Sequence, residues 1–162
     1  MARFIGDTMS IPDMGVWRAR WERPERKRLG VRGERVDDGV VVLKVDLRYG
    51  DEREDDRLFA AAAVTHAVDS AAAGAVNSHL DDDLQQQNGT ASLNIHFLAP
   101  LSGVITVESR LLSWGSHEAV VEVVAHDEQG TLVLKALTGY SIRPRAPRTE
   151  AGSDPVNRAA NS

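Results

Sequence analysis

The segment that most constrains this chain is the run LFAAAAVTHAVDSAAAGAVN, residues 58–77. Alanine is the strongest helix former and the run contains no proline, so we expect one long helix here. Asp55 and Asp56 precede the run, and either carboxylate would cap the N-terminus of the helix. Most of the helix circumference is apolar, and a helix of this kind must be wrapped by other apolar surface to be stable in water.

Strands are expected on both sides of this helix. Two precede it, a short one over residues 31–36 and a longer one over 40–47, joined by the turn DDG. Four follow it, over residues 90–98, 103–114, 117–127 and 131–142. The joints WGS and DEQG are short enough for hairpins, which favours antiparallel pairing of the last three strands.

The first strand after the helix shows the clearest period of two. From residue 90 to 97 its side chains alternate strictly, with Ala91, Leu93, Ile95 and Phe97 on one face and Thr90, Ser92, Asn94 and His96 on the other. A curved antiparallel sheet of five to six strands would wrap the central helix. The sequence therefore predicts an α+β fold with the layout called the hotdog.

Composition and length set the class of protein. The chain has 162 residues, 42% of them hydrophobic and 27% charged, as expected for one globular domain. We expect an N-terminal extension packed on the domain (residues 1–29), the hotdog domain (30–142) and a disordered tail (143–162). There is no cysteine, and we see neither a signal peptide nor an uninterrupted apolar span, so a cytoplasmic protein that does not bind membranes is expected. The net charge of −5 argues against a nucleic-acid binder.

One narrow polar strip interrupts the apolar helix. Thr65, His66, Asp69 and Ser70 fall within roughly 140° of the helical wheel, and Ala73 and Asn77 continue the strip. The strip is either a solvated side of the helix or the wall of a cleft, where a half-buried carboxylate would suit a general base. His66 is a candidate partner for Asp69. The two residues could also begin a metal site, but no third ligand lies nearby in the sequence, so no metal is expected.

The helix and the strands that follow it carry a family resemblance. HAVDSAAAGAVN, then GTASLNIHFLAP, then GVITVESRLLSWGSHEAVVEVVAHDEQGTLV resemble the hotdog-fold acyl-CoA thioesterases of the phenylacetate-pathway and 4-hydroxybenzoyl-CoA type. The resemblance covers about residues 30 to 142 and is strongest from 66 to 133. It implies hydrolysis of an acyl-CoA to a free acid and CoA, with no cofactor, by a homodimer or homotetramer.

The resemblance also implies roles for individual residues. The acid on the central helix, here Asp69, acts on the thioester as general base or nucleophile, and Thr90 helps to position the attacking water. The family's active site lies at a dimer interface, so Asp69 would face Thr90 and the backbone of a second subunit. CoA phosphates would meet basic side chains, for which Arg143, Arg145 and Arg148 are candidates.

At one position the chain departs from the family. Members usually open the helix with His-Gly-Gly, and a glycine N–H there polarises the thioester carbonyl, whereas this chain has Ala60, Ala61 and Ala62. The Ala61 N–H is the corresponding donor, at the N-terminus of the helix. Ala60 and Ala62, together with His66 and Asn77 on the polar strip, are expected to contact the substrate.

The missing motif keeps two other functions open. One is a hotdog protein that binds acyl-CoA or a related ligand without hydrolysing it, or that serves in assembly. The other is hydratase or dehydratase chemistry, which needs a histidine and an acid across the cleft, with His96 as the candidate histidine.

Overall fold

The computed structural model describes residues 23–48, 57–81 and 84–145, and these form a six-stranded sheet, a long helix and a short one. The elements in chain order are α2 (Pro24–Arg28), β1 (Val31–Asp37), β2 (Val40–Asp46), α3 (Arg57–His79), β3 (Gln85–Phe97), β4 (Val104–Trp114), β5 (Glu118–His126) and β6 (Leu132–Pro144). Asp55 and Asp56, the predicted capping residues, lie outside the described residues.

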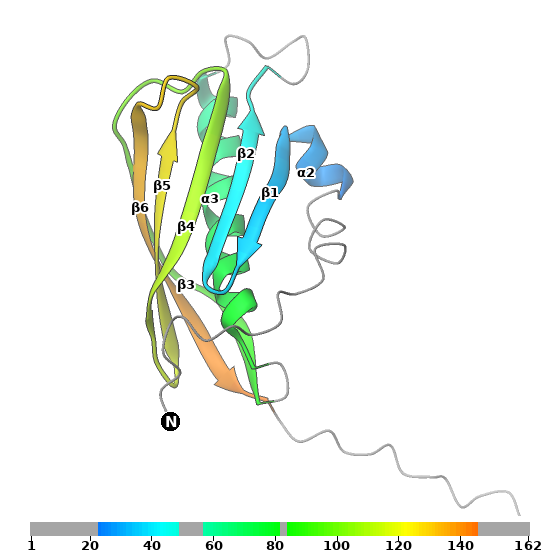
Figure 1. Ribbon diagram of the computed structural model, residues 1–162, viewed down its shortest axis with the longest axis vertical. Coiled ribbons are helices and arrows are strands. Elements are labelled where there is room, and N and C mark those ends of the chain that lie inside the picture. The colour runs from blue at the N-terminus through cyan, green and yellow to red at the C-terminus, as the bar shows by residue number, and fades with distance from the viewer. Residues whose placement is uncertain (1–22, 49–56, 82–83, 146–162) are drawn as a thin grey trace, which may run out of the picture.

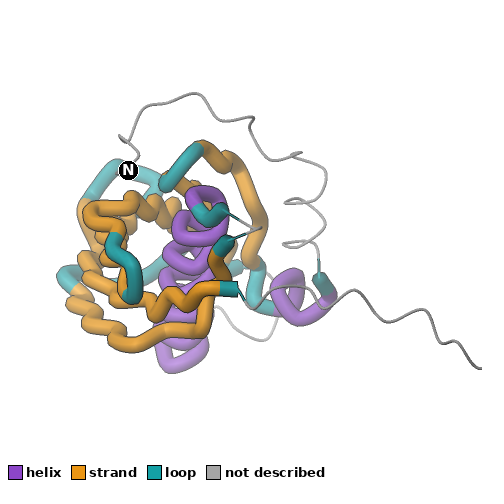
Figure 2. Tube along the Cα trace, turned by 90° about the horizontal axis from the view of Figure 1, so that it is seen from below, coloured by secondary structure: helices purple, strands orange, loops and turns teal. Residues whose placement is uncertain are grey.

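The sheet is antiparallel throughout and curves around α3. Its strand order is β1-β2-β4-β5-β6-β3, so β1 and β3 are the two edges. Figure 1 shows the strands running beside the helix, and Figure 2, viewed from below, shows them curling around it. The predicted hotdog fold, with six strands and one long central helix, is confirmed.

The alanines of α3 allow the sheet to approach the helix closely. Alanine and valine side chains of α3 are fully buried on several sides of the helix, among them Ala63, Ala67, Val68, Ala71, Ala72 and Val76. By length and composition alone α3 could also cross a membrane, but most of its most apolar window is buried inside the domain. It is therefore the core of the fold, wrapped by the inner face of the sheet.

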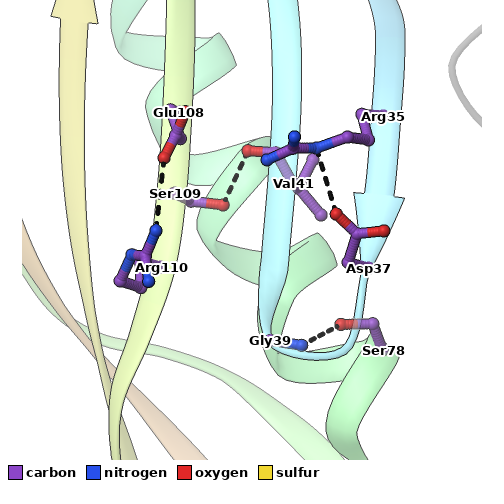
Figure 3. Close-up of polar contacts among 8 residues, drawn as sticks. All are labelled: Arg35, Asp37, Gly39, Val41, Ser78, Glu108, Ser109 and Arg110. Carbon is purple, nitrogen blue, oxygen red and sulfur yellow. Dashed lines mark hydrogen bonds and ion pairs between the residues drawn. The ribbon is translucent and has the colours of Figure 1, made fainter. Parts of the chain in front are cut away.

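A buried serine links the helix to the sheet. The Ser109 hydroxyl on β4 lies 2.9 Å from the Ala71 carbonyl oxygen of α3 and 3.2 Å from the Val41 carbonyl oxygen of β2 (Figure 3 shows the second contact). Ser109 is completely buried. A buried hydroxyl needs a hydrogen-bond acceptor, and these two carbonyls fix how far α3 lies from the sheet.

The turn between β1 and β2 is tied to the end of α3. The His79 ring Nδ1 lies 2.6 Å from Asp38 Oδ1, and the Gly39 N–H donates to Ser78 Oγ at 2.9 Å (Figure 3). Gly39 has a φ of +70°, which only glycine adopts without strain. The His79 ring packs edge-on against Trp114, with ring centroids 4.8 Å apart. These contacts close one end of the core.

We predict that Asp38→Ala destabilises the protein by about 1–3 kcal/mol, because it leaves the buried His79 ring without its partner. Asp37→Ala is the matched control, since the side chain of Asp37 forms, among the described residues, only an exposed ion pair with Arg35, at 3.0 Å (Figure 3). An exposed pair contributes about 1 kcal/mol or less. Urea unfolding of both variants measures the difference, and equal losses would show that the Asp38–His79 contact adds nothing beyond a surface pair.

The ends of the domain differ from the expected boundaries in small ways. β3 begins five residues before the predicted strand, at Gln85, and pairs there with Pro144 of β6. Because of this pairing, β6 continues through Arg143 and Pro144, which the sequence assigned to the tail. The short helix α2 lies beside β1 (Figure 1). Residues 1–22 and 146–162 lie outside the described residues.

Candidate functional site

The polar strip of α3 is the side of the helix that the sheet leaves partly open. Thr65, His66, Asp69 and Asn77 are all half-buried on α3, while most other side chains in its middle are buried. The edge strands β1 and β3 both contact α3, so the open strip lies between the two edges of the sheet. Asp69 is the one carboxylate on this strip.

Thr90 reaches Asp69 because β3 is irregular on both sides of it. The register with β6 shifts between Gln87 and Thr90 and again between Thr90 and Ser92. Each shift adds one residue to β3, and an added residue moves the following side chain to the other face. The predicted strict alternation is therefore wrong at this point: Thr90 shares the inner face with Leu93 instead of lying opposite to it.

Two hydroxyl groups hold the Asp69 carboxylate. Thr90 Oγ1 donates to Asp69 Oδ1 at 2.8 Å, and the Tyr140 hydroxyl lies 2.6 Å from the same oxygen and 2.8 Å from the Asp69 carbonyl oxygen. Thr90 and Tyr140 are directly paired across β3 and β6. Both contacts form within one chain. Among the described residues, no hydrogen bond reaches the other carboxylate oxygen, Oδ2.

Tyr140 is a site residue that the sequence reasoning missed. Its side chain is 1% exposed. Burial, followed by the hydrogen bond to Asp69, raises the pKa of Tyr140 far above its usual value, so the hydroxyl keeps its proton and remains a donor. The available signal was a tyrosine among the inward positions of β6, because a buried phenol needs a polar partner.

His66 is not bonded to Asp69. Its Nε2 lies 3.4 Å from the Ser70 hydroxyl, one turn along the helix. Burial is the main cause that lowers the pKa of His66, and the positive charge of Arg26 on α2 lowers it further, against a smaller opposite effect of Asp69. His66 is therefore a neutral imidazole at pH 7, and the predicted partnership with Asp69 is not observed. Its contact with substrate stays a prediction.

Ala61 is the fifth residue of α3, one position further into the helix than the predicted start at residue 58 implied. α3 begins at Arg57, four residues earlier, because Arg57, Leu58 and Phe59 all tolerate helix and no proline or glycine stops it. A helical N–H in the fifth position bonds to the carbonyl four residues before it, here Arg57. Ala60 is buried, Ala61 half-buried and Ala62 exposed. A donor role for Ala61 thus requires the first turn to open.

The remaining candidates lie away from Asp69. Asn77 is two turns further along α3, at a distance of about 12 Å along the axis. His96 lies on the outer face of the sheet, where it lines a shallow groove of about 320 Å³ together with Asn94, Glu122, Lys135, Ala136 and Leu137. A histidine on the opposite face cannot act with Asp69 within one chain, so the predicted hydratase pair is not assembled there.

The basic residues suggested for CoA phosphates are only partly placed. Arg143 is the second-last residue of the strand β6, and the Arg145 N–H donates to the Leu84 carbonyl oxygen. Arg148 falls outside the described residues. No group of three histidine, aspartate or glutamate residues in the described part of the chain is arranged to hold a metal ion.

Comparison with known proteins identifies relatives of this fold and this sequence. The profile described as "Thioesterase superfamily" matches residues 53–134. A protein of Saccharolobus solfataricus named "Putative esterase SSO1253" is 32% identical over 115 residues, covering 70% of this chain and 74% of that protein.

Solved structures with the same fold include two thioesterases. A mutant thioesterase of Pseudomonas aeruginosa has a TM-score of 0.69 at 22% identity, covering 83% of this chain and 96% of that one. A thioesterase of Haemophilus influenzae has a TM-score of 0.65 at 13% identity, covering 88% and 96% respectively. At these identities the structures show the shared fold.

Proposed function

Because this chain belongs to the thioesterase superfamily, we propose that it hydrolyses an acyl-CoA thioester to the free acid and CoA, with Asp69 as the general base. The observation that supports this most directly is the state of the Asp69 carboxylate. It lies on the open strip of α3 with Oδ1 held by two hydroxyls and with Oδ2 free of hydrogen bonds from the described residues. A base must be fixed in place and must still have an oxygen available to take a proton.

The proposed reaction uses that oxygen twice. Oδ2 takes a proton from a water molecule as the water oxygen bonds to the thioester carbonyl carbon, and the carbonyl electrons move onto its oxygen. The tetrahedral intermediate then expels the CoA thiolate by breaking the carbon–sulfur bond. The thiolate takes the proton that Asp69 holds, which returns the carboxylate to its ionised state.

The developing oxyanion needs a donor, and the Ala61 N–H is the proposed one. To serve, it must exchange its helical carbonyl partner for the thioester oxygen, so the turn Arg57–Ala60 has to open when substrate binds. This requirement is also the observation that favours the second candidate function, a hotdog protein that binds acyl-CoA without cleaving it. If the turn stays closed, the thioester carbonyl has no donor at this position.

The proposed active unit is a homodimer formed at the β3 edge, and two dimers would give the homotetramer. β3 is a 13-residue edge strand, and the free backbone N–H and C=O groups along such an edge can pair with another chain. Large apolar side chains are exposed along and just after it: Leu93 is 39% exposed, Phe97 46% and Leu98 55%. A second copy would cover them beside Asp69 and give the acyl group an apolar wall.

Thiol release from short-chain, aromatic and long-chain acyl-CoAs tests the proposal with the native chain. The expected result is turnover of one acyl class above the rest, at a rate that is unchanged in His96→Ala, because His96 lies on the opposite face of the sheet. Acyl-CoA binding measured by calorimetry without thiol release would instead establish the non-hydrolytic function. If the protein neither bound acyl-CoA nor released thiol, both functions would be rejected.

Ala61→Gly should raise kcat several-fold while lowering stability. Glycine in a helix interior costs about 1 kcal/mol relative to alanine, which favours opening of the first turn of α3. It also removes the methyl group beside the proposed donor. Thiol release and thermal unfolding of the variant check both effects. A variant that loses stability and activity together would argue against opening of this turn as part of the reaction.

A further inference from the structure

We infer that Tyr140 is a positioning residue for the reaction: with Thr90 it fixes the orientation of the Asp69 carboxylate so that only Oδ2 faces the open strip of α3. This inference rests on the proposed function, because the role it assigns is that of aligning the general base.

The Tyr140 hydroxyl lies between two oxygens of the same residue, 2.6 Å from the carboxylate oxygen Oδ1 and 2.8 Å from the backbone carbonyl oxygen of Asp69. Its single proton is donated to one of these oxygens or shared between them, and Oδ1 is the closer acceptor. The phenol therefore holds Oδ1 beside the backbone of α3, which limits rotation about the side-chain bonds of Asp69. Thr90, from the neighbouring strand, donates to Oδ1 from the exposed side.

The two donors are in different surroundings. Tyr140 is buried, and a hydrogen bond to a charged group is stronger away from water than in contact with it. Thr90 is exposed, so water can replace much of its contact. If the Tyr140 hydroxyl is removed, water therefore cannot take its place as a hydrogen-bond donor to Asp69.

The charged and titratable groups around Asp69 are few. His66 precedes it by one turn on α3 and is neutral at pH 7, and Arg26 of α2 faces His66. Tyr140 on β6 keeps its proton at neutral pH. A substitution at Tyr140 therefore alters the surroundings of Asp69 without changing the charge of either neighbour at neutral pH.

Tyr140→Phe is the test, because it removes the hydroxyl and keeps the ring. We expect kcat to fall roughly 10-fold or more, as for loss of one hydrogen bond to a charged group, with KM little changed. The matched control is Thr138→Val, two residues earlier on β6, which removes a buried hydroxyl that donates to the Val121 carbonyl oxygen at 3.1 Å and does not touch Asp69.

A merely structural tyrosine would give a different pattern. Tyr140→Phe and Thr138→Val would then lose similar stability, and neither would change kcat. That result, in a protein that hydrolyses acyl-CoA, would overturn the inference.

The carboxyl ¹³C NMR chemical shift of Asp69 provides a readout that does not depend on activity. The inference expects this chemical shift to change in Tyr140→Phe, which removes a hydrogen bond to the carboxylate, and to stay at the native value in Thr138→Val. If the native chain releases no thiol but the chemical shift changes, the proposed function fails while the positioning of the carboxylate stands. An unchanged chemical shift overturns the inference whether or not the protein is active.

Discussion

Asp69→Asn is expected to lower kcat/KM for acyl-CoA hydrolysis by about 100-fold or more, the usual contribution of a general base. The amide has the shape of the carboxylate and can still accept hydrogen bonds from Thr90 and Tyr140. It cannot take a proton from water at neutral pH. The loss should therefore appear in kcat, and thermal unfolding should show a folded protein.

Asp37→Asn serves as the matched control for this variant. It makes the same chemical change in an exposed ion pair on β1. Thiol release from the preferred acyl-CoA should be unchanged in the control. If Asp69→Asn retained activity within a few-fold of the native chain, the base would have to be another group, and the role assigned to the polar strip of α3 would be wrong.

Ala71→Leu is expected to be the most destabilising of the variants considered, at about 3 kcal/mol. Overpacking a well-filled core costs about 1–3 kcal/mol, and a helix displaced from the sheet would also leave the buried Ser109 hydroxyl without a partner. Ala71 is completely buried, and its carbonyl oxygen accepts the Ser109 hydrogen bond. For a chain of this length the change corresponds to a fall in Tm of roughly 6–12 °C.

Ala62→Leu is the control for overpacking, since Ala62 is an exposed residue of the same helix. Leucine and alanine have similar helix propensity, so this variant should unfold near the native temperature. Differential scanning calorimetry of both proteins makes the comparison. Equal stability of the two variants would mean that the sheet does not pack tightly against α3.

Local sequence patterns were sufficient to predict the fold. The alanine run predicted α3 to within one residue at its start and two at its end, because helix propensity and apolar periodicity agree there. The strands after it were predicted to within a few residues, since alternating residues and short hairpin joints mark them clearly. Each of these features depends on residues close together in the chain.

The details of the site depend on contacts between distant residues, and the sequence analysis placed them less well. Asp69 was predicted, but its bond to Tyr140 joins residues 71 positions apart. Thr90 was expected in the site through the family resemblance, while alternation alone put it on the wrong side of β3. α3 begins one residue before the predicted start, which makes Ala61 its fifth residue, and a helical N–H at that position has a carbonyl partner within the helix.

The two irregularities in the pairing of β3 beside Thr90 affect how this site can change in evolution. With the present spacing, Thr90 and Leu93 share the inner face because the pairing with β6 skips one residue between Thr90 and Ser92, and Gly89, with a φ of +100°, belongs to the irregularity on the other side of Thr90. A one-residue deletion at Ala91 would restore regular pairing and would leave Thr90 opposite Tyr140 on the inner face, because Ala91 is the residue that the pairing skips. In this strand a deletion would thus shorten the chain without removing Thr90 from the site, and relatives aligned here without gaps would appear to have lost a threonine that they still possess.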